Sequence, residues 1–143
     1  MRLFAPMTRE FPVVFFVDQD APALNYLLAQ IEPIFLSHSL RNVGQIRRYV
    51  DQMEPDILVL SDRLEYRKKD IRAILADLRA EYTLPILMLV DSVTEQDRAR
   101  WREWGATDCI LHPTRLTDRI DAVTRKILDV VHPRYSSDPE GMT

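Results

Sequence analysis

The sequence predicts a doubly wound α/β domain, in which a five-stranded parallel sheet carries helices on both faces. Short, continuous apolar runs alternate along the chain with segments in which apolar residues recur every three or four positions. Continuous apolar runs are typical of strands buried on both faces, and strands that alternate with helices form parallel sheets with right-handed crossovers. The expected strands are 13–17, a weaker edge strand at 34–36, 57–60, 86–90 and 109–111.

Five segments between these runs have helical spacing. The first follows Asp20, a residue suited to the N-cap, and the fourth stops at Gly105, a residue suited to a left-handed C-terminal position. The third follows a basic run, Arg67-Lys68-Lys69, for which a solvated loop is favoured, with a basic docking spot for an acidic partner as the alternative. The expected helices cover about 22–31, 43–53, 71–78, 93–104 and 116–130.

Composition limits the possible functions. The chain has 143 residues, 46% of them hydrophobic, which fits one soluble domain with a single core. A net charge of −3 weighs against nucleic-acid binding, and no apolar run reaches the roughly 18 residues of a membrane span. The only cysteine, Cys109, cannot form an internal disulfide, so we expect a cytoplasmic protein. We expect an N-terminal extension at 1–11, a domain at 12–131, and a tail or linker to an effector domain at 132–143.

Polar residues gather where the expected strands end. In doubly wound folds the functional site forms beyond the carboxyl ends of the strands, where the strand order reverses. The residues at these ends are Asp18, Gln19 and Asp20 after the first strand, Ser61 and Asp62 after the third, Val90 at the end of the fourth, and His112 after the fifth.

Four segments at these strand ends resemble the response-regulator receiver domain of two-component signalling, across about residues 12–131. They are 17–22 (VDQDAP), 55–62 (PDILVLSD), 84–90 (LPILMLV) and 105–113 (GATDCILHP). The resemblance implies a flavodoxin-like sheet with strand order 2-1-3-4-5. It also implies a family chemistry in which an aspartate accepts a phosphoryl group with Mg²⁺ bound by carboxylates, while a hydroxyl residue and a lysine contact the phosphoryl oxygens.

Carried over position by position, the family's site is largely missing from this sequence. Asp18 fills the first acidic position, but Gln19 occupies the second, which normally binds the metal. Ser61 stands at the acceptor position, Val90 at the hydroxyl position and His112 at the lysine position. The resemblance therefore implies a degenerate pseudo-receiver with no catalytic residue, no bound metal or other cofactor, and a role in protein interaction that does not depend on phosphorylation.

A second alignment is possible at the acceptor position. If the alignment shifts by one residue, Asp62 becomes the acceptor, and Asp18 and Asp20 become the Mg²⁺ ligands of an atypical but phosphorylatable receiver. An apolar residue is expected three positions after the acceptor. Leu64 meets this expectation for Ser61, whereas Glu65 does not meet it for Asp62. We favour Ser61 and keep Asp62 as the alternative.

The resemblance also indicates where partners would bind. In the family, the fourth helix, fifth strand and fifth helix form the usual dimer and effector surface, so we expect protein partners or self-association there. Trp101 and Trp104 share one face of the fourth helix; core packing is favoured for them, with exposure as a binding hot spot as the alternative. The charged residues expected on the fifth helix of this surface include Arg115, Arg119, Asp121 and Arg125.

Overall fold

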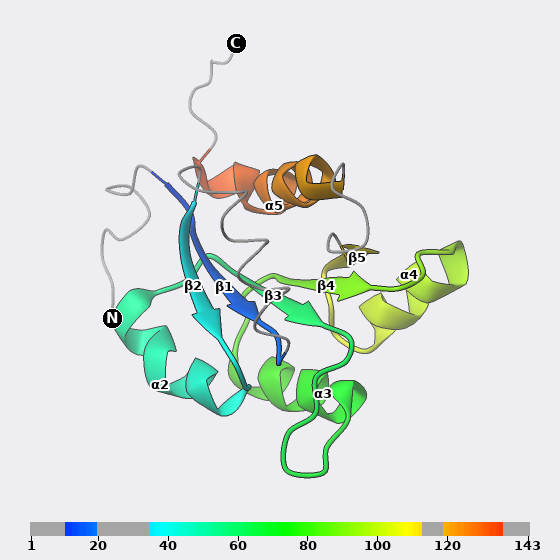
Figure 1. Cartoon of the computed structure of the whole chain (residues 1–143). Helices are drawn as coiled ribbons and strands as arrows, with labels where there is room; N and C mark the ends of the chain where they lie inside the picture. Colours follow the sequence, from blue (N-terminus) through cyan, green and yellow to red (C-terminus); the bar gives the residue numbers. More distant parts are fainter. Residues whose placement is uncertain (1–10, 20–34, 113–118, 136–143) are drawn as a thin grey trace.

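The sheet of the computed structural model has five parallel strands in the order β2-β1-β3-β4-β5, as predicted (Figure 1). The structure describes residues 11–19, 35–112 and 119–135, although the side chains of 119–121 and 132–135 are outside this description. The strands are β1 (Val13–Val17), β2 (Leu36–Leu40), β3 (Ile57–Ser61), β4 (Ile86–Val90) and β5 (Asp108–Leu111).

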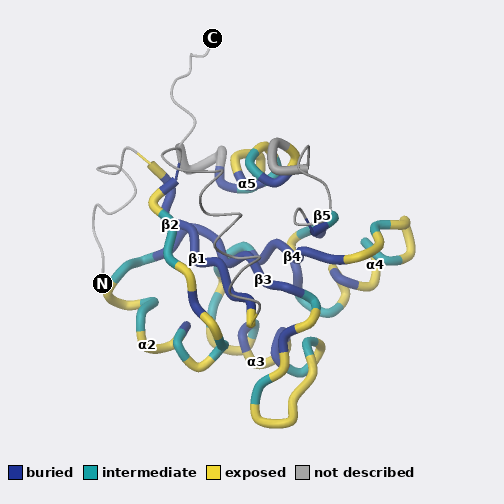
Figure 2. Tube along the Cα trace, viewed as in Figure 1, coloured by how far each residue is buried: buried dark blue, intermediate teal, exposed yellow. Residues whose placement is uncertain are grey.

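Each central strand is buried on both faces because helices cover both sides of the sheet (Figure 2). Side chains alternate along a strand, so Phe15 and Val17 enter one core cluster while Val14 and Phe16 enter the other. Helices α2 (Gly44–Met53), α3 (Ile71–Glu81) and α4 (Glu95–Glu103) supply the first cluster, and α5 (Arg119–Tyr135) supplies the second. This arrangement confirms the doubly wound fold predicted from the continuous apolar runs.

The position predicted for the edge strand is wrong. The apolar run at 34–36 suggested the strand, but β2 is Leu36–Leu40, of sequence LSHSL, paired in register from Val13↔Leu36 to Val17↔Leu40. The apolar residue Phe35 lies just before the strand and is buried in the cluster under α5. An edge strand has a partner on one side only and tolerates polar residues, so its apolar pattern is a poor guide to its bounds.

Helix α4 begins with a capping box. Thr94 Oγ1 accepts a hydrogen bond from Asp97 N at 3.1 Å, and Asp97 Oδ2 accepts one from Thr94 N at 3.1 Å. Hydrogen bonds from the side chains of Ser92 and Thr94 and from the backbone of Thr94 hold the pKa of Asp97 at about 2. The cap fixes the start of a helix that has little apolar surface, since Trp101 is its only buried residue.

The predicted positive φ at Gly105 is confirmed, at +118°. Arg79 from α3 lies against this glycine: Arg79 Nε donates to Gly105 O at 2.6 Å, and Nη1 donates to Leu84 O at 2.5 Å. A Cβ added at Gly105 would stand 2.8 Å from Arg79 Cγ, so both conformation and space favour glycine here. Arg79 thus joins α3 to the segments that enter β4 and β5.

Helix α5 runs to Tyr135, four residues beyond the domain boundary expected at 131. The helix predicted at 22–31, with its N-cap Asp20, lies outside the described residues. In the part of the chain that the structure describes, no helix has the length and apolar character needed to cross a membrane.

Candidate functional site

The carboxyl ends of the strands bring Asp18, Ser61 and His112 to one edge of the sheet. Backbone hydrogen bonds continue the sheet just past its strands and fix these residues: Asp18 N donates to Leu40 O at 3.1 Å, and His112 N donates to Val90 O at 2.8 Å. The parallel arrangement therefore places residues at the edge that are 94 positions apart in the sequence.

At this edge, His112 contacts Asp18. His112 Nε2 lies 3.2 Å from Asp18 Oδ2, and the residues are only 5% and 7% exposed. A carboxylate removed from water is stabilised by a hydrogen-bond donor or a positive charge, and the imidazole can supply either. The contact occupies the Asp18 carboxylate with a protein group.

The Gln19 side chain also has a structural partner. Gln19 Oε1 accepts a hydrogen bond of 2.7 Å from Glu65 N, in the segment that joins β3 to α3. The amide oxygen therefore ties the end of β1 to the chain beyond β3. An asparagine or glutamine oxygen used in this way has less capacity left for a metal ion.

Ser61 is the last residue of β3 and is buried, and its Oγ accepts a hydrogen bond of 3.2 Å from Arg63 N. The Arg63 guanidinium in turn lies 3.2 Å from Asp91 Oδ1, just after β4. The sequence had not suggested the Arg63–Asp91 contact. The sequence feature that could have predicted this contact is a pair of opposite charges that follow two adjacent strands.

Asp62 lies beside this pair, and its backbone N donates to Leu89 O at 3.0 Å. Its Oδ1 atom is buried and has no hydrogen-bond partner among the described residues. Burial and the nearby charge of Asp91 raise the pKa of Asp62, against smaller opposing effects of a backbone hydrogen bond from Asp91 and the charges of Arg63 and His112. Asp62 is therefore the least well compensated carboxyl group described at this edge.

Val90 is buried in the core cluster that α2, α3 and α4 cover. Its methyl groups cannot donate a hydrogen bond to a phosphoryl oxygen. Asp20 lies outside the described residues, so its relation to this edge is not part of the structure.

The structure is similar to solved receiver domains over 81–90% of the chain. A CheY-like receiver domain protein from Methanospirillum hungatei is 11% identical, covers 90% of this chain and 100% of its own, and has a TM-score of 0.68. The receiver domain of a modulated diguanylate cyclase from Desulfovibrio desulfuricans is 20% identical over 90% and 100%, with a TM-score of 0.65. The Francisella response regulator 1452 receiver domain is 16% identical over 81% and 98%, with a TM-score of 0.62.

No protein-family model matches the sequence, and no curated protein matches it either. The strand order and the solved structures together show that this chain has the receiver fold, in a strongly diverged sequence.

Mg²⁺, which the receiver fold implies, does not fit the donors described here. The ion requires several hard oxygen ligands in near-octahedral geometry. Asp18 Oδ2 faces His112, and Gln19 Oε1 accepts a backbone hydrogen bond. Across residues 11–19, 35–112 and 119–135, no three His, Cys, Asp or Glu side chains are grouped so that they could hold a metal ion.

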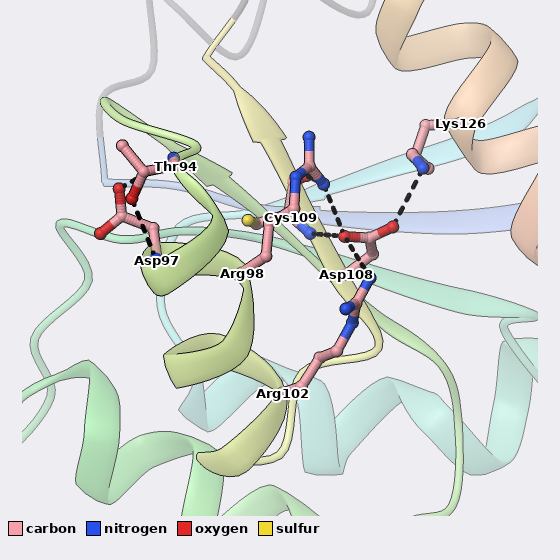
Figure 3. Close-up of polar contacts among 7 residues, drawn as sticks. All are labelled: Thr94, Asp97, Arg98, Arg102, Asp108, Cys109 and Lys126. Atoms are coloured by element: carbon pink, nitrogen blue, oxygen red, sulfur yellow. Dashed lines mark hydrogen bonds and ion pairs between the residues drawn. The ribbon is translucent and has the colours of Figure 1, made fainter.

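The surface formed by α4, β5 and α5 is organised around Asp108 (Figure 3). Asp108 Oδ1 lies 2.8 Å from Arg98 Nη1 and 3.5 Å from Arg102 Nη2, and Oδ2 lies 3.0 Å from Lys126 Nζ. Burial raises the pKa of this carboxyl, but hydrogen bonds from Lys126 and the Cys109 backbone, with the charges of Lys126 and Arg98, outweigh it and lower the pKa. One carboxylate thus joins all three elements of the surface.

The tryptophans of α4 pack inward, as favoured. Trp101 is 6% exposed and therefore does not belong on the interaction surface, where it had been a candidate. Trp104 is half-buried, with its ring centroid 5.3 Å from that of Trp101 and the guanidinium groups of Arg72 and Arg100 over its own ring. A short helix with so few apolar residues needs both rings to attach it to the sheet.

The charged candidates on α5 are only partly described. Arg115 lies outside the described residues, and the backbones of Arg119 and Asp121 are in the first turn of α5. Arg125 is exposed, as an interaction surface requires.

Proposed function

We propose that this domain is a degenerate receiver that recognises protein partners without being phosphorylated. The observation that carries the proposal is the buried His112–Asp18 contact, because it occupies the metal-binding carboxylate with the residue that stands at the lysine position. Phosphoryl transfer is catalysed mainly by positioning and by neutralisation of charge, so a site without its cation and its lysine supplies little of either.

The neighbouring residues support the same proposal. Gln19 and Ser61 hold the segments after β1 and β3 through hydrogen bonds to Glu65 N and Arg63 N. Leu64 is buried in the core, which is the environment expected three positions after the acceptor if Ser61 stands there. These side chains make contacts within the protein at the positions where an active receiver would hold its phosphoryl site.

We propose no enzymatic activity, and we place the domain in the cytoplasm as part of a larger signalling protein. Its partners would be proteins or a second copy of the chain, bound at the surface of α4, β5 and α5. Exposed Arg125 and Leu128, the latter 40% exposed, support a contact made by α5.

Beryllofluoride with Mg²⁺ tests this proposal, because it mimics a phosphorylated aspartate. We expect the ¹H–¹⁵N NMR spectrum of the chain to stay unchanged when millimolar beryllofluoride and Mg²⁺ are added. Shifts that spread from residues 61–62 and 90–91 would show that a phosphoryl site is intact.

The second candidate is a receiver that is phosphorylated on Asp62. The buried Oδ1 without a partner among the described residues, and the raised pKa of Asp62, favour it, because this carboxyl lacks the compensation that a bound cation would supply in an active receiver. In that case the beryllofluoride shifts would appear in the wild type and disappear in Asp62→Asn, while Ser61→Ala would retain them.

A further inference from the structure

A pocket opens between α2, α3 and the segment that joins β3 to α3. Its volume is about 330 Å³, within the range of binding pockets in proteins. Buried Ile46, Ile74 and Leu78 give it an apolar floor, and Tyr66 forms part of its wall. A Cβ added at Gly44 would meet the Tyr66 hydroxyl group, so a glycine at the start of α2 lets this wall approach the helix.

The pocket is flanked by a tight hairpin in the segment after β3, which projects from the molecule and is largely exposed (Figures 1 and 2). Tyr66 and Lys69 exchange backbone hydrogen bonds of 3.1 and 2.9 Å across the turn. The two central residues, Arg67 and Lys68, have φ angles of 52° and 66°. A two-residue hairpin with both φ angles positive is a type I′ turn, which strongly favours Asn-Gly. Arg67 and Lys68 therefore adopt a left-handed backbone conformation that is unfavourable for residues with long side chains.

The basic residues around the pocket differ in whether they form ion pairs. On its rim, Arg47 lies 2.7 Å from Glu81, and Lys69 lies 2.6 Å from Asp77, so these cations are neutralised. Arg67 and Lys68 form no ion pair with any described residue; the Arg67 guanidinium lies 5.1 Å from the Tyr66 ring centroid. The segment 63–72 carries five basic and two acidic residues in a chain of net charge −3, which makes the hairpin a local positive patch.

We propose that this pocket and hairpin bind an acidic peptide segment of a partner protein, with one apolar side chain of the peptide in the pocket and its carboxylates on Arg67 and Lys68. The apolar floor fits one apolar side chain of the peptide. Arg67 and Lys68, which are not in the ion pairs of the rim, fit carboxylates that neighbour this side chain in the peptide sequence. Lys68 does not line the pocket, so it contributes only to an occupant that extends beyond it. A nucleic acid has no apolar side chain to fill the floor of the pocket, and the net charge of the chain is −3.

The site lies apart from His112 and Asp18, so the inference does not rest on the absence of phosphorylation. A receiver phosphorylated on Asp62 would have the same pocket. Peptide binding and beryllofluoride binding therefore succeed or fail independently.

A random 12-residue peptide library displayed on phage and selected on the whole chain tests this inference. Selected peptides would be labelled with fluorescein and measured by fluorescence anisotropy. The variant R67N/K68G keeps the turn and removes both hairpin cations. The control R41Q/R48Q removes the same charge from exposed residues that do not line the pocket.

We expect enriched peptides with an apolar residue beside Asp or Glu. R67N/K68G should bind them at least tenfold more weakly, R41Q/R48Q within about twofold of the wild type, and replacement of the peptide's apolar residue by serine should also weaken binding tenfold. A library that yields no enriched peptide, basic peptides only, or peptides that bind R67N/K68G as well as the wild type would overturn the inference. So would single-stranded DNA that binds the hairpin more tightly than any selected peptide.

Discussion

His112 Nε2 lies 3.2 Å from Asp18 Oδ2 in a buried contact that joins the ends of β1 and β5. In the proposed alignment with receiver domains, His112 stands at the lysine position and Asp18 at the first acidic position. Side chains that would contact the metal ion and the phosphoryl group in an active receiver therefore contact each other here. We take this contact as the structural reason for the proposed loss of phosphorylation.

A double-mutant cycle on Asp18→Asn and His112→Gln measures this contact. Each single change should lower the free energy of unfolding by about 2 kcal/mol, the scale of a hydrogen bond to a charged group. Because the residues are in contact, the double variant should lose at least about 0.5 kcal/mol less than the sum, measured by urea unfolding. The control pairs His112→Gln with Asp56→Asn, since Asp56 Oδ2 instead accepts from Val13 N at 2.8 Å. Additive losses in the Asp18 cycle would show that the two side chains are not coupled.

The fold was predicted because its signals are local. Continuous apolar runs mark strands covered on both faces, and β1, β3, β4 and β5 appear where these runs predicted them. The edge strand β2 was misplaced because, among the described residues, it pairs with a strand on one side only, and its sequence, LSHSL, is mostly polar.

The site was predicted as a set of positions, but its contacts were not. Sequence order places Asp18 and His112 at the same edge, whereas only the structure shows that their side chains meet. The Gln19–Glu65 and Arg63–Asp91 contacts depend on the path of the chain after β3, which the apolar pattern of the sequence does not predict. Charge pairs of this kind leave no periodic pattern in a sequence.

Asp62 should make stability depend on pH. Its pKa is raised in the folded state, so the folded protein disfavours the ionised form. The contribution of the protonated carboxyl is fully present below the unfolded pKa of about 4 and is lost as pH rises through the folded pKa. Asp62→Asn should therefore be more stable than the wild type at pH 7, with a difference that shrinks towards pH 3. Thermal unfolding across this range measures it, and an equal difference at both pH values would contradict the assigned cause.

Replacing the centre of the hairpin should stabilise the fold. The left-handed conformation costs a non-glycine residue roughly 1–2 kcal/mol. Replacing Lys68 by glycine removes this cost, but part of the gain in stability is offset because glycine makes the unfolded chain more flexible. We expect R67N/K68G to raise the free energy of unfolding by about 1 kcal/mol in urea unfolding. A loss of stability would mean that Arg67 and Lys68 stabilise the turn by contacts that outweigh the strain.

Asp108 should contribute far more to stability than an exposed ion pair. Asp108→Asn leaves Arg98 and Lys126 without their carboxylate, and we expect a loss of about 2 kcal/mol. The matched change Asp77→Asn breaks the exposed contact with Lys69 and should cost less than about 1 kcal/mol. Similar losses in the two variants would show that the Asp108 contacts are no stronger than a surface pair.

The most direct test of the proposed loss of phosphorylation is the intact mass of the chain after incubation with acetyl phosphate and Mg²⁺. The groups of a phosphoryl-transfer site act as a unit, so restoring the acceptor alone with Ser61→Asp should leave the mass unchanged, as in the wild type. The quadruple variant Q19D/S61D/V90T/H112K is the positive control and should gain one phosphoryl group. A phosphoryl group gained by the wild type on Asp62, or by Ser61→Asp to the same extent as by the quadruple variant, would contradict the account.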